Sequence, residues 1–305
     1  MLVTGKNVLV KARRKKYAVP AFNINNLEIL KAVIGAAEKM KSPVIVQTSE
    51  GAVEYAGMSY LTAMIRVAAS GKIPVVMHLD HGKDLKVIWR AIKEGYTSVM
   101  IDGSALPYSK NVAVTRKVVK KAHAKGVSVE AEIGALAGIE DFVSVEEKDA
   151  ALTNPEEAER FVEETNCDAL AVAIGTSHGA FKFKSKTHLD IKRLEDISKR
   201  VSVPIVLHGA SGVREDMTSL AEKHGAKLGK TRGVLDEDIK KAIRHGVAKV
   251  NIDTDLRIAF TAGVREALDE MPTIIDPRKL LAGSTLLMRE IAMQKMKLMG
   301  SAGRA

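Results

Sequence analysis

Three histidines each follow a short apolar run. His81 ends the run that begins at Pro74, His178 follows the run 169–174, and His208 follows the run 204–207. Runs of this length and composition are typical of buried strands. A titratable group at the end of such a strand costs free energy to desolvate unless it is paired or bound. One histidine alone would favour an ordinary hydrogen-bonded side chain, but three at corresponding positions predict a catalytic metal site of the three-histidine type.

Several carboxylates stand near these histidines. Asp80 adjoins His81, where a carboxylate could orient the imidazole or transfer a proton to a metal-bound substrate. Asp102 follows another apolar run, and Glu130 and Glu132 share one face of an expected strand because they are two residues apart. Acids on inward positions either pair with lysine or arginine or hold a second cation. The sequence leaves these two alternatives open.

Two segments rich in small and polar residues look suited to phosphate. Segment 209–212 follows His208, and segment 251–254 ends the last expected strand. Backbone N–H groups can approach an anion closely at such turns, and phosphate sites in barrels commonly use the loops after strands seven and eight. The simpler alternative for segment 209–212 is a tight connection. The residues concerned are Gly209, Ala210, Ser211, Asp253 and Thr254, with Gly179 and Lys182 as additions.

The other histidines are not expected to be metal ligands. His78 lies deeper in the strand than His81 and is interpreted as a core residue or as a support for the metal ligands. The histidines that fall on helices or connections are interpreted as surface residues. These are His123, His188, His224 and His245.

Short strand-like runs alternate with longer helix-like runs along the chain. Eight such units predict a (β/α)8 TIM barrel, for which about 250 residues are typical. The alternative is an open doubly wound sheet, but no G-x-G-x-x-G follows any strand. The carboxyl ends of barrel strands meet at one rim, so this fold would bring the three histidines together. The expected strands are 17–24, 43–49, 74–81, 98–103, 128–134, 169–175, 204–211 and 249–255. The expected helices are 27–40, 59–69, 85–94, 111–125, 155–164, 191–199, 215–224, 236–244 and 256–270.

We see no linker, and we expect residues 1–305 to form a single α/β barrel domain with a C-terminal helical extension over about 277–305. The last helix carries an apolar stripe that we expect to pack on the protein's own body, with a subunit interface as the second interpretation. Lys249 opens the eighth expected strand and therefore should lie at the end of the barrel opposite the histidines.

Composition narrows the classes of function. The chain has 305 residues, of which 46% are hydrophobic, and carries a net charge of +10 with one dense basic run at 11–16. Aromatic residues are 4%, too few for stacking on single-stranded nucleic acid, so a phosphorylated small molecule is the favoured anionic partner. The lone Cys167 excludes an intramolecular disulfide and fits a reducing compartment. No signal peptide or membrane span is evident, so we expect a cytoplasmic protein without a membrane partner.

Taken together and in order, the motifs closely resemble class II, metal-dependent ketose-bisphosphate aldolases, in the branch of fructose- and tagatose-bisphosphate aldolases. The resemblance runs over essentially the whole chain. The segments that carry it are Val19-Pro20-Ala21-Phe22-Asn23, Val44-Ile45-Val46-Gln47-Thr48-Ser49, His78-Leu79-Asp80-His81-Gly82, Glu130-Ala131-Glu132-Ile133-Gly134, Gly175-Thr176-Ser177-His178-Gly179, Leu207-His208-Gly209-Ala210-Ser211-Gly212, Val250-Asn251-Ile252-Asp253-Thr254-Asp255 and Ser301-Ala302-Gly303.

The resemblance implies reversible cleavage of fructose 1,6-bisphosphate to dihydroxyacetone phosphate and glyceraldehyde 3-phosphate through a metal-stabilised enediolate, as in glycolysis and gluconeogenesis. It implies a divalent ion, usually zinc and in some members cobalt, held by His81, His178 and His208. Asp102 and Glu132 match positions that hold a second metal in some members, where a monovalent cation is a further alternative. Lysine imine chemistry is then not needed.

The resemblance also assigns roles around the metal. Asp80 matches the acid that exchanges a proton with the C4 oxygen. Glu140 matches the carboxylate that handles the C3 proton of dihydroxyacetone phosphate, although the preceding Ala137-Gly138-Ile139 departs from the usual Gly-Gly and polar residue. Asn251 would lie beside the enediolate. The matches to the pocket for that triose's phosphate are Gly179, Gly209, Ala210, Ser211, Asp253 and Thr254, and those to the aldehyde half are Asn23, Ser49, Arg257 and Arg278.

Three alternatives accompany this expectation. The substrate could be tagatose 1,6-bisphosphate, the C4 epimer. The chain could be a catalytically silent barrel subunit that supports a partner aldolase, or a basic nucleic-acid-binding protein. We expect a homodimer or homotetramer, in which Arg278 could reach the site of a neighbouring subunit.

Overall fold

The computed structural model describes residues 1–305 except 135–136, 141–142, 146–151, 179–188 and 230–232. For 137–140, 143–145 and 177–178 it describes the backbone alone. Among the described residues, eight parallel strands close into a barrel in the order β1-β11-β10-β8-β5-β4-β3-β2, which confirms the predicted (β/α)8 fold. The barrel strands are β1 Val19–Asn23, β2 Val44–Ser49, β3 Val75–Gly82, β4 Ser98–Ile101, β5 Ser128–Ile133, β8 Ala169–Val172, β10 Ile205–Leu207 and β11 Val247–Ile252.

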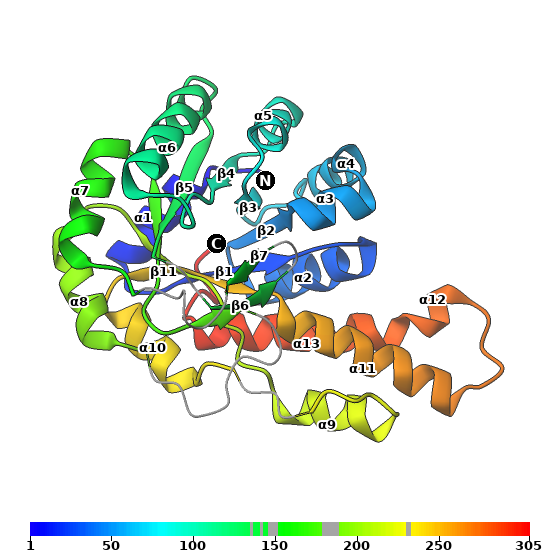
Figure 1. Ribbon diagram of the computed structural model, residues 1–305. Coiled ribbons are helices and arrows are strands. Elements are labelled where there is room, and N and C mark those ends of the chain that lie inside the picture. The colour runs from blue at the N-terminus through cyan, green and yellow to red at the C-terminus, as the bar shows by residue number, and fades with distance from the viewer. Residues whose placement is uncertain (135–136, 141–142, 146–151, 179–188, 230–232) are drawn as a thin grey trace.

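Helices surround the barrel (Figure 1). Local sequence explains their limits: in α5, for example, the Asp84 side chain accepts a hydrogen bond from the Lys86 N–H at the start, and Gly95 ends the helix with a φ of 90°. The helices that follow the barrel strands are α2 Leu27–Met40, α3 Glu50–Ala56, α4 Met58–Ala68, α5 Leu85–Glu94, α6 Tyr108–His123, α7 Pro155–Thr165, α8 Ile191–Arg200, α9 Glu215–Lys223, α10 Asp236–Arg244 and α11 Thr254–Glu270.

Strand alternation divides the barrel into an outer apolar layer and a mixed interior. Val75, Met77 and Leu79 of β3 belong to the large core beneath the helices. Their neighbours His78 and Asp80 point to the opposite face of the strand, which is the interior of the barrel. The same two-residue period therefore buries apolar side chains outside the barrel and collects polar ones within it.

An additional N-terminal helix, α1 Gly5–Arg14, is absent from the sequence prediction. Its Val8, Leu9 and Ala12 pack against inward-facing residues of the strands, so the helix closes the amino-terminal end of the barrel. A Cβ atom on Gly5 would lie 2.9 Å from the Ser128 Oγ, so only glycine permits this close approach. The helix was missed because the basic run 11–16 dominates its sequence. Part of that charge stabilises the fold, since the Arg13 guanidinium donates to the backbone carbonyls of Ser198 and Val201 at the C-terminal end of α8.

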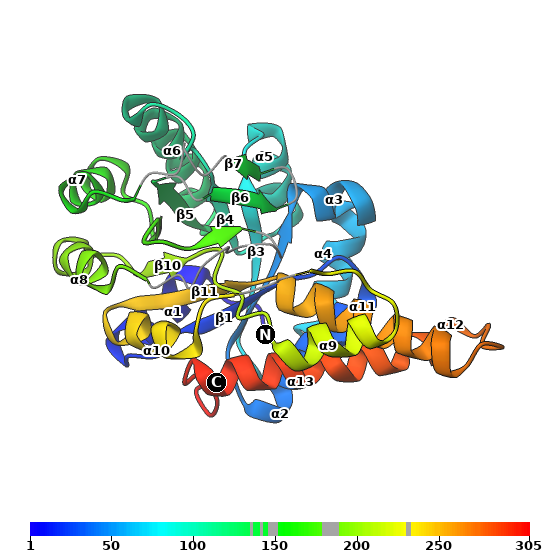
Figure 2. The same cartoon turned by 60° about the horizontal axis from the view of Figure 1, so that its bottom comes forward.

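The C-terminal segment extends α11 into an arm made with α12 Pro277–Leu280 and α13 Ala282–Leu298 (Figures 1 and 2). Helix α13 packs against α2 and α11, with Ile291 and Met296 buried, while Leu286 remains 60% exposed. The expected packing of this helix on the protein's own body is therefore confirmed for most of its apolar stripe. None of the helices in the described ranges is long and apolar enough to cross a membrane.

A small sheet lies outside the barrel in the connections that follow β5 and β8. It consists of β6 Ala137–Glu140, β7 Val143–Val145 and β9 Ser177–His178, in the order β7-β6-β9. The parallel pairing of β6 with β9 aligns Gly138 with His178. Two predicted functional segments that are about 40 residues apart in the chain thus share one backbone ladder.

Candidate active site

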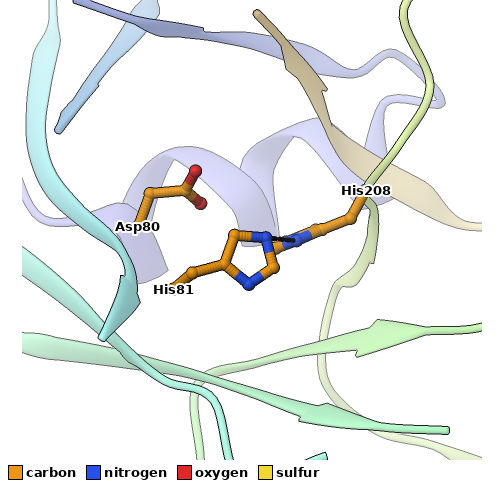
Figure 3. A group of neighbouring side chains, drawn as sticks. All are labelled: Asp80, His81 and His208. Carbon is orange, nitrogen blue, oxygen red and sulfur yellow. Dashed lines mark hydrogen bonds between the residues drawn. The ribbon is translucent and has the colours of Figure 1, made fainter. Parts of the chain in front are cut away.

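The end of β3 places two successive side chains in the same site. Successive residues of a regular strand point to opposite faces, yet Asp80 and His81 both lie beside His208 (Figure 3). His81 has a left-handed backbone with a φ of 46°, and the pairing of β3 with β4 shifts register between Leu79 and Gly82. A Cβ atom on Gly82 would lie 2.6 Å from the Met100 carbonyl oxygen. The strained backbone at His81 and the glycine after it therefore turn the imidazole toward the barrel axis.

Three amides hold the Asp80 carboxylate. The Asn23 and Gln47 side chains donate to Asp80 Oδ2 at 3.0 and 3.1 Å, and Asn251 donates to Oδ1 at 3.0 Å. Gln47 also donates to the Asn23 Oδ1. Burial alone would raise the pKa of Asp80, but the histidines and Lys249 around it outweigh burial and lower that pKa. The carboxylate is therefore ionised and fixed in orientation.

His81 and His208 face one another across the barrel axis. The His81 Nε2 and His208 Nδ1 atoms are 2.8 Å apart, and the two rings are nearly perpendicular (Figure 3). The other nitrogen of each ring contacts a carboxylate: His81 Nδ1 is 3.0 Å from Asp102 Oδ2, and His208 Nε2 is 2.7 Å from Glu130 Oε1. Carboxylates at the outer nitrogens are what orient metal-binding histidines. The inner nitrogens are thereby directed at a common point.

The charges around His81 and His208 act in opposite directions. Burial disfavours protonation of His81, but Asp80, Asp102 and Glu132 outweigh burial and raise its pKa to about 10. Burial and the nearby His81 lower the pKa of His208. In the absence of a metal the pair therefore holds one proton between the two facing nitrogens, and a cation bound there would have to displace it.

The donor set fits a divalent metal. Asp80, His81 and His208 each offer a ligand atom within 4.8 Å of the others, and His81, Asp102 and Glu132 form a second such group. The Glu132 Oε2 atom is buried and has no hydrogen-bond partner among the described residues. Burial and then the Asp102 charge raise the pKa of Glu132 well above its usual range. A cation at this point would relieve the cost of burying so many acids.

Lys249 corrects the sequence analysis. It does not open its strand but lies within β11, and its side chain is buried in the barrel. Its Nζ donates to Glu130 Oε2 at 2.8 Å and lies 3.3 Å from His78 Nε2. His78 in turn contacts the Ser98 hydroxyl at 2.8 Å, in agreement with its predicted supporting place. The sequence left two alternatives for inward-facing acids, an ion pair or a second cation. Glu130 forms the ion pair, with Lys249.

The predicted phosphate residues lie together at the carboxyl ends of β10 and β11. Ser211 is buried, and its hydroxyl accepts a hydrogen bond from the Asp253 N–H at 3.4 Å. Thr254 begins the 17-residue helix α11, whose N-terminal N–H groups favour an anion. Gly209 has a φ of 59°, and Ala210 is buried. The described part of this site combines a tight turn with a helix N-terminus.

The residues expected at the aldehyde half divide into two sets. Asn23 and Ser49 lie at the ends of β1 and β2, and Arg257 forms a bidentate ion pair with Asp253 through its Nε and Nη2. A cavity of about 580 Å³ beside them is lined in part by Asn25, Tyr55 and Arg257. Arg278 does not lie near this cavity in its own chain. It lies in α12 at the far end of the arm and pairs with Asp276.

Some predicted residues lie outside what the structure describes. Gly179, Lys182 and His188 fall in an undescribed range, and for Glu140 and His178 the backbone alone is described. His224 corrects the expectation that the histidines on helices and connections lie at the surface, whereas His123 remains partly exposed. The side chain of His224 is 2% exposed and contacts Asp269, and that of His123 is 31% exposed and contacts Asp168.

Gln47 is a site residue that was not predicted from the sequence, and Glu130 was predicted without a specific role. Gln47 is fully buried and bonds both Asn23 and Asp80. The available signal was its place two residues after Ile45, on the inward face of an otherwise apolar strand. A polar side chain there must find a partner within the barrel.

Comparisons with known proteins agree with this geometry. The sequence model of the family described as "Fructose-bisphosphate aldolase class-II" matches residues 3–304. A fructose-bisphosphate aldolase from Thermus caldophilus is 51% identical over 305 residues, and one from Helicobacter pylori is 46% identical over 306, each match covering 100% of both chains. The crystal structure of the YdjI aldolase from Escherichia coli K12 superposes with a TM-score of 0.81 at 34% identity and also covers 100% of both chains.

Proposed function

The chain belongs to the class II fructose-bisphosphate aldolase family, a family of aldehyde-lyases, and we propose that it reversibly cleaves fructose 1,6-bisphosphate to dihydroxyacetone phosphate and glyceraldehyde 3-phosphate. The observation that carries the proposal is the facing pair of imidazoles, His81 and His208, beside the amide-held carboxylate of Asp80. Silent subunits would not need to keep this costly arrangement of buried charges.

His81 and His208 would hold the catalytic divalent ion together with His178. Zinc suits three imidazoles, and cobalt is the second choice. When bound, the ion supplies positive charge where negative charge develops on the C2 and C3 oxygens during cleavage. Asp102 and Glu130 would keep the two imidazoles in the correct tautomer and orientation. Glu132, with Asp102, would accept a second metal or a monovalent cation.

Asp80 would take the proton from the C4 hydroxyl in the cleavage direction. Its low pKa keeps it ionised, and the three amide donors leave it one preferred orientation. In the synthesis direction the same group would return the proton to the C4 oxygen. Asn251, one of those donors, would also lie beside the enediolate.

Glu140 would handle the proton at C3 of dihydroxyacetone phosphate. The ladder between β6 and β9 supports this role because it links the segment of Glu140 to that of His178. The segment around β6 and β7 would then act as a cover that excludes water from the carbanion.

The two ends of the substrate would bind on different strands. The triose phosphate would lie against Gly209, Ala210, Ser211 and the N-terminus of α11 at Asp253 and Thr254, with Gly179 and Lys182 completing the pocket. The aldehyde half and its phosphate would occupy the cavity that Arg257 lines, near Asn23 and Ser49. Arg278 would be supplied by a neighbouring subunit.

The same proposal extends to the protein's setting. The reaction belongs to glycolysis and gluconeogenesis in the cytoplasm, with a homodimer or homotetramer as the assembly. Residues 1–305 would act as one barrel domain with the helical extension 277–305. Neither nucleic acid nor a membrane is a partner.

The test is cleavage of fructose 1,6-bisphosphate by chelator-stripped protein before and after addition of zinc or cobalt, with tagatose 1,6-bisphosphate in parallel. We expect activity to return with metal and to be faster for the fructose substrate. His208→Ala should lose both bound metal and turnover, whereas Glu140→Ala should keep the metal and lose exchange of the C3 proton. Activity that survives stripping would contradict the metal site, and full activity of Glu140→Ala would contradict the cover.

A further inference from the structure

A second group of metal-ligand side chains lies outside the barrel, between α9 and the last turn of α11. One ring nitrogen of His224 and one carboxylate oxygen each from Glu266 and Glu270 lie within 4.8 Å of one another. His224 directly follows α9, and the two glutamates are four residues apart on α11, so their side chains share one helix face. The proposed aldolase reaction uses none of these residues.

His224 distinguishes this group from an ordinary acidic surface. Its side chain is only 2% exposed, and its Nδ1 lies 2.7 Å from the Asp269 Oδ2. Because a carboxylate can only accept, Nδ1 carries a proton, and in the neutral form of the ring Nε2 then has the lone pair. The Nε2 atom is buried and has no hydrogen-bond partner in the described part of the chain. A buried acceptor without a partner is costly, so the site points to a ligand that the protein itself does not supply.

We propose that His224 Nε2, Glu266 and Glu270 bind a divalent transition-metal ion. One imidazole and two carboxylates suit zinc or manganese, and water would fill the remaining positions. Asp269 would hold the outer nitrogen of His224, as Asp102 does for His81 in the barrel. Such a carboxylate fixes the tautomer and raises the basicity of the ligand nitrogen.

The surroundings indicate a weaker site than the one in the barrel. Arg265 Nη1 lies 3.4 Å from the His224 carbonyl oxygen, and its positive charge opposes a cation nearby. Glu270 is exposed to solvent, which screens its charge. Bound metal would cross-link α9 to α11, which pack against each other. Helix α9 follows the strand that leads to His208, and α11 begins at Thr254, so the ion would brace two helices that position the catalytic rim.

The first experiment counts zinc in chelator-stripped protein titrated by calorimetry and checked by atomic emission after gel filtration. The unmodified protein should bind one zinc equivalent more than Glu266→Gln/Glu270→Gln, and the lost equivalent should be the weaker one. Glu222→Gln, an exposed glutamate of α9 outside the group, is the matched control and should keep it. Circular dichroism and fructose 1,6-bisphosphate cleavage should confirm that all variants are folded with an intact barrel site.

A second variant tests the part played by Asp269. Asp269→Asn keeps an acceptor for His224 but removes the charge, and it should weaken zinc at this site about tenfold or more. Thermal unfolding supplies an independent readout, because zinc above its dissociation constant should raise Tm more in the unmodified protein than in the double variant. Equal zinc stoichiometry in the unmodified protein and the double variant, or equal Tm shifts, would overturn the proposal.

Discussion

At the scale of single residues, the barrel interior is a network of paired charges around three histidines in two different surroundings. His81 and His208 present nitrogens to one another, whereas His78 lies one level deeper. Lys249 Nζ donates toward His78 Nε2, so that nitrogen is the acceptor. The Nδ1–H of His78 then donates a hydrogen bond to the Ser98 hydroxyl. Burial and then the Lys249 charge lower the pKa of His78 to about 3. His78 is therefore neutral above about pH 3.

This neutral histidine predicts an acid-sensitive stability. Below pH 6.5 the unfolded chain binds a proton at His78 that the folded chain refuses until about pH 3, so stability falls as pH falls through this window. Between pH 7 and 5 the free energy of unfolding of chelator-stripped protein should drop by about 2 kcal/mol more than in His78→Gln. Urea unfolding at both pH values measures this difference. Equal losses in the two proteins would contradict the assignment of a buried neutral imidazole.

At the scale of elements, α1 stabilises the amino-terminal end of the barrel, whereas the carboxyl ends of the strands carry the candidate active site. Leu9 of α1 is 3% exposed and packs on inward residues of the strands, while its neighbour Val10 is 49% exposed. The polar residues Asp80 and Asn251 lie toward the opposite end of the same interior. A substitution in α1 should therefore change stability without changing the reaction.

The paired variants Leu9→Ala and Val10→Ala measure this division. Leu9→Ala should lower the free energy of unfolding by about 2–5 kcal/mol because it leaves a cavity. Val10→Ala should stay within about 0.5 kcal/mol of the unmodified protein. Chemical unfolding gives both values, and KM for fructose 1,6-bisphosphate should be the same in both variants. Similar losses at the two positions would show that α1 does not close the barrel.

The limits of the helices and strands also show how much of the fold could be predicted from the sequence. Helices 27–40, 85–94 and 236–244 are predicted with their observed limits. In the first two, capping residues coincide with the apolar period, and in the third acidic residues stand in the first turn and basic residues in the last. The strand predicted at 204–211 is too long, because β10 ends at Leu207. In the segment that follows it, the Gly212 N–H donates to the Asp255 carboxylate of α11 instead of to a neighbouring strand. No local sequence pattern predicts the left-handed φ of His81 or the contact of the Lys249 side chain with Glu130 inside the barrel. Both depend on neighbouring strands, which a single segment does not encode.

At the scale of the whole molecule, the arm of α11, α12 and α13 is the feature that a lone barrel does not explain. It projects from one side (Figure 1) and carries exposed apolar side chains, Ile275 at 96% and Leu286 at 60%. Arg278 lies near its end and cannot be assigned to its own chain's rim. A second copy that covers the arm would bury the apolar residues and give Arg278 a site to enter.

This assembly predicts linked losses of association and activity. Ile275→Glu combined with Leu286→Glu should convert the dimer or tetramer to a monomer in light scattering, because two charges would have to be buried. Cleavage of fructose 1,6-bisphosphate should fall with it. Leu235→Glu, an equally simple change at a 46% exposed leucine before α10, is the control and should alter neither property. A monomeric unmodified protein would contradict the expectation outright.

The left-handed turn at His81 has a consequence for inheritance. Because that turn directs Asp80 and His81 into one site, the proposed acid and the proposed metal ligand are encoded by adjacent codons. Recombination separates adjacent codons least often, so the two groups pass to descendants as one unit. This dipeptide would then pass on the proposed acid and the proposed metal ligand together, whatever the sequences of the loops at the rim.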